Sequence, residues 1–432
     1  MSSNKIGLIP LTAIVVGSQV GSGVFMLPQM LAPYGVYAIL GWLTSGFGAL
    51  CLAMVFVGLV KRYPKNGGPH AYADVAFGST AAFFTGWAYW LSCTLGSATV
   101  IAATVNYLTP IIGDLSPLQF AGAEIVFLVI ISAVNLRGVH SAGTMETILG
   151  LVKLIVLFLL PMLGLYYFSG QNIQISPSLT GTSNLMLIGK AASLTLWAFL
   201  GVEAATTPAG SVENPTFTIP AALIIGTSCV AFLYVLNSIS LMGLIPHESL
   251  INTHTPYVLA TQLIFGGNWH LIIAMFSAIV CLSNLNAWVL AGGQIASGIA
   301  EDGLLPELFK KKNMHGAPYW SILLGCLVVI PVVLFTIDDN ISKQINIIID
   351  LAVQASLMIY LVCIASYFVI LKREGKVWWH FEQIIAAIAC VFCVVMLGTS
   401  DIKTLLYSSL FFVSGLPIHL YWKRCGAIKP TL

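Results

Sequence analysis

Long apolar stretches follow one another along almost the whole chain, and short polar segments separate them. A helix needs about 20 mostly apolar residues to cross the hydrocarbon core of a bilayer. A shorter apolar stretch, at 255–267, is predicted to form an interfacial or re-entrant helix. The pattern predicts an all-α membrane protein with twelve spans, at residues 7–31, 36–60, 82–109, 117–136, 145–168, 187–209, 220–244, 271–297, 319–336, 345–371, 382–399 and 404–422.

The distribution of the basic residues predicts how the protein is oriented in the membrane. Cytoplasmic loops of membrane proteins carry an excess of Lys and Arg. With a cytoplasmic N-terminus, the outer segments hold only Lys190, Lys343 and Lys403, and Lys153 lies within a span. We therefore expect a multi-pass protein of the cell inner membrane with both termini cytoplasmic. The predicted inner segments hold 14 of the 18 basic residues: Lys5, Lys61, Arg62, Lys65, Arg137, Lys310, Lys311, Lys312, Lys372, Arg373, Lys376, Lys423, Arg424 and Lys429.

Composition and motifs narrow the function. Of the 432 residues, 58% are hydrophobic and 8% are charged, and the mean hydropathy is +0.93, whereas soluble domains carry roughly 25% charged residues. The nine cysteines lie in apolar segments and are expected to be reduced packing residues. No hydrolase, phosphate-loop or metal-ligand motif occurs, so we expect a transporter without cofactor or metal rather than an enzyme. Residues 1–424 are predicted to form one transmembrane domain, followed by a short cytoplasmic tail, 425–432.

The stretch GSQVGSGVFMLP, residues 17–28, interrupts the first span with small and polar residues. Irregular backbone at membrane depth is tolerated where it lines a cavity, because its polar groups need partners. Gly21, Ser22 and Gly23 are predicted to unwind the helix, and a second half-helix is predicted from about Val24. Its free N–H groups would then face an acceptor on a substrate. The alternative is close helix packing through small residues.

A second interruption is predicted in the sixth span, where LTLWAFLGVEAATTPAG places Gly201, Glu203 and Pro208 in an apolar run. Spans one and six are the first members of two successive five-helix halves, 7–168 and 187–371, which enter the membrane from opposite sides. Two further helices, 382–422, follow. Interrupted helices at matching positions of inverted halves point to a transport site at the bilayer midplane.

Several motifs resemble those of one transporter family. They are GSGVFMLP in span one, NGGPHAY at 66–72, TLWAFLGVEAA at 195–205, ENPTFTIP at 213–220 and AEDGLLPELF at 300–309. In this order they resemble the amino acid–polyamine–organocation superfamily, in particular the bacterial arginine/agmatine and putrescine/ornithine exchangers. The resemblance implies a LeuT-like 5+5 inverted repeat with broken helices 1 and 6. It also implies an amino acid or amine substrate, a lipid bilayer environment and a homodimer, and no nucleic acid.

The resemblance also implies a substrate site between the two breaks. The N–H groups around Ser22 and Gly23 would bind the substrate carboxylate, and carbonyls near Gln19 would bind the α-ammonium. Trp197 would occlude the site by stacking on the substrate arm, and Tyr360 would gate the inner side. The further residues implied for the site are Trp197, Ala198 and Gly201 in span six, Tyr89, Ser92, Cys93 and Ser97 in span three, and Asn284 and Trp288 in span eight.

The sequence departs from the guanidinium-selective relatives at the substrate arm. Ser97 and Val100 stand where those relatives carry asparagine and methionine, and Asn284 stands where they carry serine. Arginine and agmatine therefore cannot be assumed as substrates. Thr216 and Phe217 replace a basic pair in the loop after span six, which concerns inner gating.

Four ionisable residues fall within predicted spans, where such residues are functional candidates by default. Glu203 is the candidate for proton or cation coupling, with a structural hydrogen bond at the break as the alternative. Lys153 matches a lysine of proton-coupled permeases and would either exchange a proton or act as a fixed positive charge bracing spans one and eight. Asp350 would be either a proton or substrate partner or a residue in water at the outer membrane edge, which is the favoured interpretation. Glu124 is expected near the outer end of its span, at the interface.

Two transport mechanisms and one non-transport function remain open from the sequence. The antiporter-like motifs favour exchange of a basic amino acid of the arginine, ornithine or lysine type for an amine or another amino acid by alternating access. Lys153 and the changed pocket favour proton-coupled amino acid uptake. A transporter-shaped amino acid sensor is the third possibility.

Overall fold

The computed structural model describes residues 6–64, 68–138, 153, 156–203, 206, 212–335, 341–375 and 380–424. The regular structure of these residues is helical, and isolated bridges pair Ile6 with Val212 and Tyr34 with Ile175. The longer helices are α1 (Leu8–Gln19), α2 (Ser22–Leu31), α3 (Val36–Arg62), α5 (Ser79–Ile112), α6 (Pro117–Leu136), α8 (Asn184–Leu196), α9 (Pro215–Leu244), α11 (Pro256–Phe265), α12 (Trp269–Glu301), α13 (Tyr319–Phe335), α14 (Ile341–Arg373), α15 (Phe381–Gly398) and α16 (Ile402–Ser414). The shorter ones are α4 (Pro69–Phe77), α10 (His247–Asn252), α17 (Leu416–Arg424) and the 3-10 turns η1 (Gly170–Asn172), η2 (Pro177–Leu179), η3 (Trp197–Phe199) and η6 (Glu307–Lys310).

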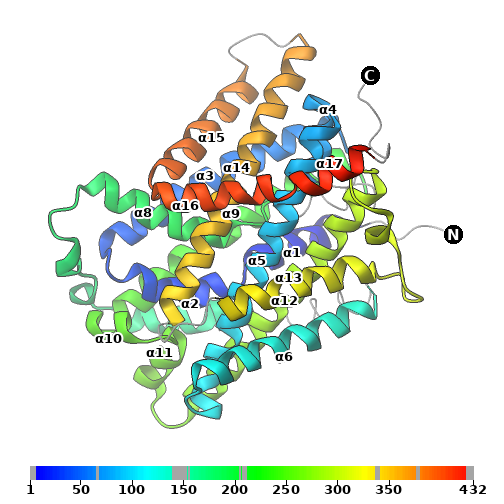
Figure 1. The fold of residues 1–432 in the computed structure, drawn as a ribbon. Coiled ribbons are helices and arrows are strands. Elements are labelled where there is room, and N and C mark those ends of the chain that lie inside the picture. Colours follow the sequence, from blue (N-terminus) through cyan, green and yellow to red (C-terminus); the bar gives the residue numbers. More distant parts are fainter. Residues whose placement is uncertain are drawn as a thin grey trace.

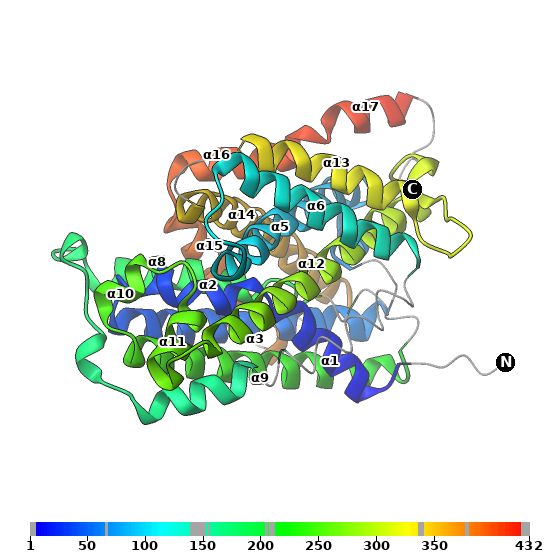
Figure 2. The same cartoon turned by 90° about the horizontal axis from the view of Figure 1, so that it is seen from below.

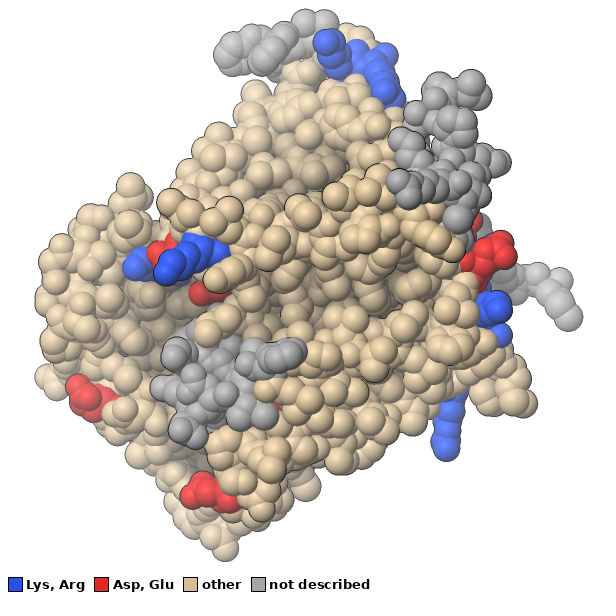
Figure 3. Space-filling view, in the orientation of Figure 1, with Lys and Arg blue, Asp and Glu red and all other residues tan. Residues whose placement is uncertain are grey.

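The helices have the length and composition of membrane spans. Within the described residues, eight helices are long and apolar enough to cross a bilayer, and the bent pair α1–α2 makes a ninth. Shorter apolar helices occur at Val156–Tyr166, Asn184–Phe199, Pro256–Phe265 and Tyr319–Leu334. The surface in Figure 3 is mostly uncharged, and most of its charged side chains lie near the margins of the face in view. The prediction of an all-helical, multi-pass membrane protein is confirmed.

Individual helices follow the predicted spans with some differences. The short apolar stretch forms α11, a helix too short to cross the bilayer, and α6 has the bounds predicted for span four. The last span is interrupted at Gly415 between α16 and α17, where the rings of Trp87 and Phe83 lie so close that a Cβ would be 2.8 and 3.0 Å from them. Much of span five and the part of span six around Pro208 lie outside the described residues.

Three helix pairs build the centre of the protein. Helix α5 packs along α12, and α3 packs against both α8 and α9 (Figures 1 and 2). Small residues bring α3 and α8 close together, since a Cβ on Gly41 would lie 2.7 Å from Cβ of Ala191. In membranes such small residues allow helix backbones to approach and gain van der Waals contact. The broken pair α1–α2 packs on α9 and is thereby held in the centre of the bundle.

The first span is broken, as predicted, but at a slightly different place. Helix α1 ends at Gln19, and α2 begins at Ser22 with a bend of 41°. Between them Val20 has an extended backbone and Gly21 has a non-helical one, with φ and ψ both −145°. The expectation that Ser22 and Gly23 unwind and that the half-helix begins near Val24 is therefore wrong. Both residues belong to the first turn of α2, so the irregular segment is confined to Val20 and Gly21.

Two of the predictions for intramembrane carboxyl groups need correction. Glu124 is 1% exposed, so it lies inside the helix bundle and not on its surface, where an interfacial residue was expected. The reason is helical phase, because Glu124 shares the buried face of α6 with Ala121 and Leu128. Asp350 in α14 is half-buried rather than fully in water.

An ion-pair cluster joins three helix ends. The Arg62 guanidinium at the end of α3 lies 2.9 Å from a carboxylate oxygen of Glu374, just after α14, and 2.9 Å from one of Glu382 in α15. The same guanidinium lies over the Tyr367 ring, 5.4 Å from its centroid. This cluster fixes the ends of α3, α14 and α15 relative to one another.

Candidate functional site

The break in the first span leaves backbone groups without helical partners. At the start of α2, the first N–H groups cannot bond within the helix. At the end of α1, the carbonyl of Gln19 accepts a hydrogen bond from Tyr234 Oη at 2.6 Å. The Gln19 amide Nε2 donates to Thr227 Oγ1 at 3.1 Å. Helix α9 therefore holds the end of α1 in place but leaves the start of α2 open.

Three buried polar atoms around the break have no hydrogen-bond partner among the described residues. They are Gln19 Oε1, Ser22 Oγ and Asn284 Nδ2, and their residues are 3%, 1% and 2% exposed. Asn284 reaches the break from α12, because a Cβ on Gly21 would lie 2.2 Å from its side chain. Buried polar groups are normally bonded. Three unpaired groups at one place therefore indicate a position for a polar ligand.

The sixth span is also broken, and its break touches the first. Helix α8 ends at Leu196, the single turn η3 follows, and Gly201 adopts a φ of 94°, which favours glycine. Ser18 Oγ donates to the Gly201 carbonyl at 3.3 Å. A Cβ on Gly23 would lie 3.2 Å from both Ala198 Cβ and Trp197 Cδ1. The sequence motifs on the two spans thus form one continuous cluster.

Two predicted pocket tryptophans lie parallel to each other. The ring centroids of Trp197 and Trp288 are 6.1 Å apart, and their planes differ by 1°. Gly96 on α5 makes room for Trp288, because a Cβ there would lie 3.2 Å from the indole. Trp197 is 5% exposed and therefore belongs to the interior rather than to the lipid surface, and Trp288 is half-buried. Indole faces attract cations electrostatically.

Glu203 is bonded by two tyrosines from different helices. Tyr89 Oη on α5 donates to one carboxylate oxygen at 2.6 Å, and Tyr360 Oη on α14 donates to the other at 2.7 Å. Glu203 is 3% exposed. The sequence implied roles for these three residues separately, and the structure places them in one hydrogen-bonded group that links α5, α14 and the segment after η3.

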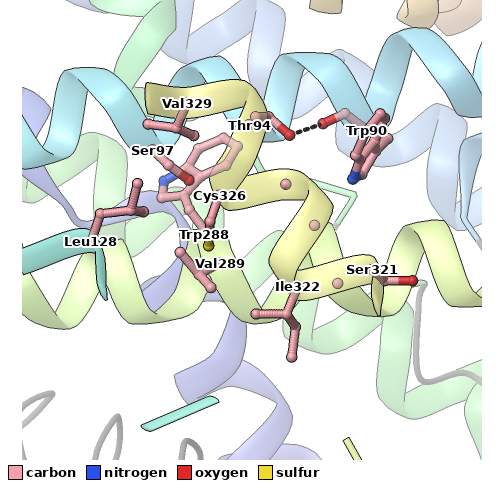
Figure 4. A pocket seen from close by; sticks show the side chains of 13 residues that line it. Trp90, Thr94, Ser97, Leu128, Trp288, Val289, Ser321, Ile322, Cys326 and Val329 are labelled. Atoms are coloured by element: carbon pink, nitrogen blue, oxygen red, sulfur yellow. Dashed lines mark hydrogen bonds between the residues drawn. The ribbon is translucent and has the colours of Figure 1, made fainter. Parts of the chain in front are cut away.

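Two further predicted site residues of α5, Ser92 and Ser97, bond within their own helix, and Ser97 also lines a cavity. The Ser92 and Ser97 hydroxyls bond to carbonyls of their own helix, those of Ala88 at 2.9 Å and Cys93 at 3.2 Å. Ser97 and Trp288 line a small cavity between α5, α6, α12 and α13 (Figure 4). Figure 4 shows Cys326 and Val329 of α13 on the side of this cavity that faces Ser97 and Trp288. The cavity therefore borders Trp288, whose indole is parallel to that of Trp197.

Lys153 lies against the first half of the broken span. Its side chain is 2% exposed, and Nζ lies 3.5 Å from the Gly17 carbonyl oxygen of α1. It therefore contacts the break region from the side of α1, as the bracing interpretation and the proton-exchange interpretation both require. Among the described residues, no group of three or more His, Cys, Asp or Glu side chains is arranged to hold a metal ion.

Sequence reasoning missed the contribution of α9. Thr227 and Tyr234 both bond to Gln19, and Tyr234 also lies against Trp42, with ring centroids 4.9 Å apart. The two residues are seven apart, which places them on one face of a helix. That spacing on an apolar span was the available signal, although it does not reveal which helix the face meets.

Comparison with known proteins places the chain among transporters. It is 29% identical to a putrescine transporter, PotE, of Haemophilus influenzae over 422 residues, covering 96% of this chain and 97% of that protein. It is 28% identical to PotE of Escherichia coli over 437 residues, covering 99% and 97%. It is 29% identical to a cadaverine/lysine antiporter of Escherichia coli over 434 residues, covering 98% and 96%. Residues 6–415 match the family model for amino acid permeases. The chain therefore belongs to the amino acid permease family, whose members are transporters.

Proposed function

We propose that the protein is an inner-membrane antiporter that exchanges a basic amino acid for an amine or for another amino acid by alternating access. The observation that carries this proposal is the set of unpaired polar atoms of Gln19, Ser22 and Asn284 at the break between α1 and α2. The similarity to a putrescine transporter and to a cadaverine/lysine antiporter supports the same class of substrate.

The proposed architecture is a LeuT-like inverted repeat of twelve spans, with residues 7–168 and 187–371 as its halves and both termini cytoplasmic. The breaks at Gly21 and after η3 are the features that support this arrangement, since they lie in the first span of each proposed half. In such transporters the substrate binds near the midplane, at the interface of the two repeats. Alternating access would move one group of helices against the other around that position.

The substrate would be held by both breaks. Its carboxylate would accept hydrogen bonds from the N–H groups of Ser22 and Gly23, where the helix dipole is positive. Its α-ammonium would donate to carbonyls near Gln19 and from Trp197 to Gly201. The Gln19 and Gly201 carbonyls already accept one hydrogen bond each, and a carbonyl has two lone pairs, so each retains one acceptor position.

The cationic arm of the substrate would lie against the tryptophans and Glu203. A cation over an indole gains about 0.5–2 kcal/mol, and Trp197 would close over the arm. Tyr360 would gate the inner side, since it connects α14 to Glu203. Ser92, Cys93 and Ser97 would complete the wall on α5, with Tyr89 bonded to Glu203. The class of substrate that fits is a mono- or dication with an aliphatic arm.

Proton-coupled uptake is the second candidate, and one contact favours it. Lys153 Nζ is buried within 3.5 Å of a carbonyl oxygen of α1. A lysine there could lose its proton during the cycle and so couple the movement of α1 to a proton gradient. In the exchange mechanism, the same contact braces α1.

Reconstitution in liposomes distinguishes these candidates. Vesicles are preloaded with unlabelled lysine, ornithine, arginine, putrescine or leucine, and uptake of labelled lysine or putrescine is followed with and without an inward proton gradient. Exchange predicts uptake that requires an internal partner, persists without the gradient and survives Lys153→Ala. Uptake into empty vesicles that follows the gradient and is abolished by Lys153→Ala would instead establish the proton-coupled mechanism.

A further inference from the structure

The buried face of α6 carries polar side chains away from the helix breaks. The helix begins at a capping box formed by Ser116 and Gln119. Farther along, Asn135 Nδ2 donates to Asn286 Oδ1 of α12 at 3.0 Å, and Ser132 Oγ lies 2.7 Å from Cys326 Sγ of α13. These two residues are paired across the helix interface. Glu124 lies on the same face, nearer the start of the helix.

Glu124 differs from these neighbours because its side chain is ionisable and one of its carboxyl oxygens is buried without a hydrogen-bond partner among the described residues. Its side chain is 1% exposed, and Oε1 receives no hydrogen bond from any described residue. The carboxyl group lies about 10 Å along the helix axis from the start of α6. An isolated carboxylate in apolar surroundings is strongly disfavoured. The group must therefore bind a cation or a proton.

The helices around Glu124 offer no fixed counter-ion. Helices α5, α12 and α13 pack on α6, and none of them contains Lys or Arg. No described side chain of these or other helices forms an ion pair with Glu124. The titratable residues of the three packing helices are Tyr89, Cys93 and Tyr107 on α5, His270, Cys281 and Glu301 on α12, and Tyr319 and Cys326 on α13. Helices α14 and α16 contribute Ile348 and Phe411 to an apolar cluster that also contains Ala121 and Leu128 of α6. The charged residues of these two helices are Lys343, Asp350, Lys372, Arg373 and Lys403.

The small cavity between α5, α6, α12 and α13 lies one helical turn of α6 from Glu124. Leu128 is one helical turn after Glu124, on the same face, and it lines the cavity together with Ser97 and Trp288 (Figure 4). Trp288 is in turn parallel to Trp197 at the helix breaks. Movement of α12 or of the tryptophan pair during transport would therefore change the space, and the access of water, next to Glu124.

We propose that Glu124 is a proton-binding site, separate from Glu203 and Lys153, that couples proton movement to transport. With the surroundings closed, the carboxyl group holds a proton. When the cavity between α5, α6, α12 and α13 opens to water, the O–H bond breaks, the proton passes to water and the carboxylate remains until the cavity closes. This inference rests on the proposed transport function, because the cavity opens only if the helices move during a transport cycle.

The test uses the full-length protein and two readouts. Infrared spectroscopy of the protein in nanodiscs detects the C=O band of a protonated carboxylic acid at neutral pH, without any substrate. In proteoliposomes, a pH-sensitive dye reports proton movement while labelled putrescine exchanges for internal lysine. Glu124→Gln preserves shape and removes the acid. Glu248→Gln, at an exposed site on α10, is the matched control.

The proposal expects a protonated-acid band that disappears in E124Q and remains in E248Q. It also expects proton movement to accompany exchange in the wild-type protein and in E248Q, and to fall at least tenfold in E124Q. Absence of the band, or its persistence in E124Q, would overturn the assignment. Two outcomes would overturn the coupling role: loss of the band in E124Q with unchanged proton movement, and exchange without proton movement in the wild-type protein. In either case Glu124 would be a neutral carboxyl group with a structural role only. If neither lysine nor putrescine is exchanged, the proposed function fails, while the infrared spectrum still decides whether Glu124 holds a proton.

Discussion

Asn284 fills the space that a side chain on Gly21 would need. A Cβ atom on Gly21 would lie 2.2 Å from Cγ and Oδ1 of Asn284 and 2.4 Å from its Nδ2. The φ of Gly21, −145°, lies outside the left-handed region that favours glycine. The neighbouring helix α12 therefore supplies the steric reason for glycine at the break.

This contact predicts that a substitution at Gly21 destabilises the protein and that a second substitution, at Asn284, restores stability. Gly21→Ala should lower the free energy of unfolding by about 1–3 kcal/mol, the usual cost of overpacking a closed interior, and should slow exchange. Combining it with Asn284→Ala should restore most of the stability, because alanine lacks Cγ, Oδ1 and Nδ2, the three atoms that lie in the way of the methyl group. The measurement is denaturant unfolding of the purified protein in detergent.

The control is Gly298→Ala, in α12, where no atom lies within 4 Å of the added Cβ. It should be as stable as the wild-type protein or slightly more stable, since alanine favours helix. Equal stability of G21A and G298A would contradict the contact.

The two tyrosines on Glu203 should act together. Tyr89→Phe and Tyr360→Phe each remove one hydrogen bond to a different carboxylate oxygen, and each should destabilise the protein by about 1–3 kcal/mol. In a Glu203→Gln background the same substitutions should cost less, because the charge-assisted bonds are already lost. Unfolding measurements on the double-mutant cycle give the coupling.

Tyr166→Phe serves as the control, since Tyr166 is 86% exposed. If each tyrosine substitution lowers the free energy of unfolding by the same amount in the wild-type and Glu203→Gln backgrounds, the two tyrosines do not act through Glu203.

Trp197 should matter more for cationic than for neutral substrates. Trp197→Leu removes the indole but keeps an apolar side chain, so it should weaken binding of lysine or putrescine about 2- to 30-fold, corresponding to a cation–π contribution of ~0.5–2 kcal/mol. Competition with labelled substrate in proteoliposomes measures this change. Trp269→Leu, at a side chain that is 59% exposed, should have no effect. Equal weakening for leucine and lysine would mean that Trp197 supplies only packing.

The ion-pair cluster at Arg62 should stabilise the ends of three helices. Arg62→Lys keeps the charge but cannot reach both Glu374 and Glu382 with a planar fork, so it should lower the thermal midpoint in detergent, and Arg62→Ala should lower it further. Lys61→Ala, at an exposed neighbouring position, should leave the midpoint unchanged. If Arg62→Ala and Lys61→Ala have the same thermal midpoint, the ion-pair cluster contributes no measurable stability, as is common for exposed pairs.

Much of the helical framework could be predicted from the sequence. Helix α6 has the predicted bounds, and the interruption of the first span lies within one or two residues of the prediction. Both depend on local properties: hydropathy sets where the chain enters lipid, and small polar residues in an apolar run mark backbone that needs other partners. The family resemblance could be recognised for the same reason, since its motifs are continuous stretches.

The sequence could not place Glu124, which was expected at the interface and is buried. Its burial depends on how α6 is rotated about its axis relative to α5, α12 and α13. The weak amphipathicity of an apolar span does not define that rotation. The role of Tyr234 was missed for the same reason, because an apolar helix gives little indication of which neighbour it meets.

The sequence by itself determined that this chain forms apolar helices in a membrane, where the first one breaks, and to which family it belongs. Only the tertiary structure decided that Tyr89 and Tyr360, 114 and 157 residues from Glu203 in the chain, bond to its two oxygens, and that Asn284 lies over Gly21. The physical reason is that helix formation and membrane insertion depend on each segment separately. The site depends on which faces of distant helices pack together, and that is set by shape complementarity and by small residues at the contacts.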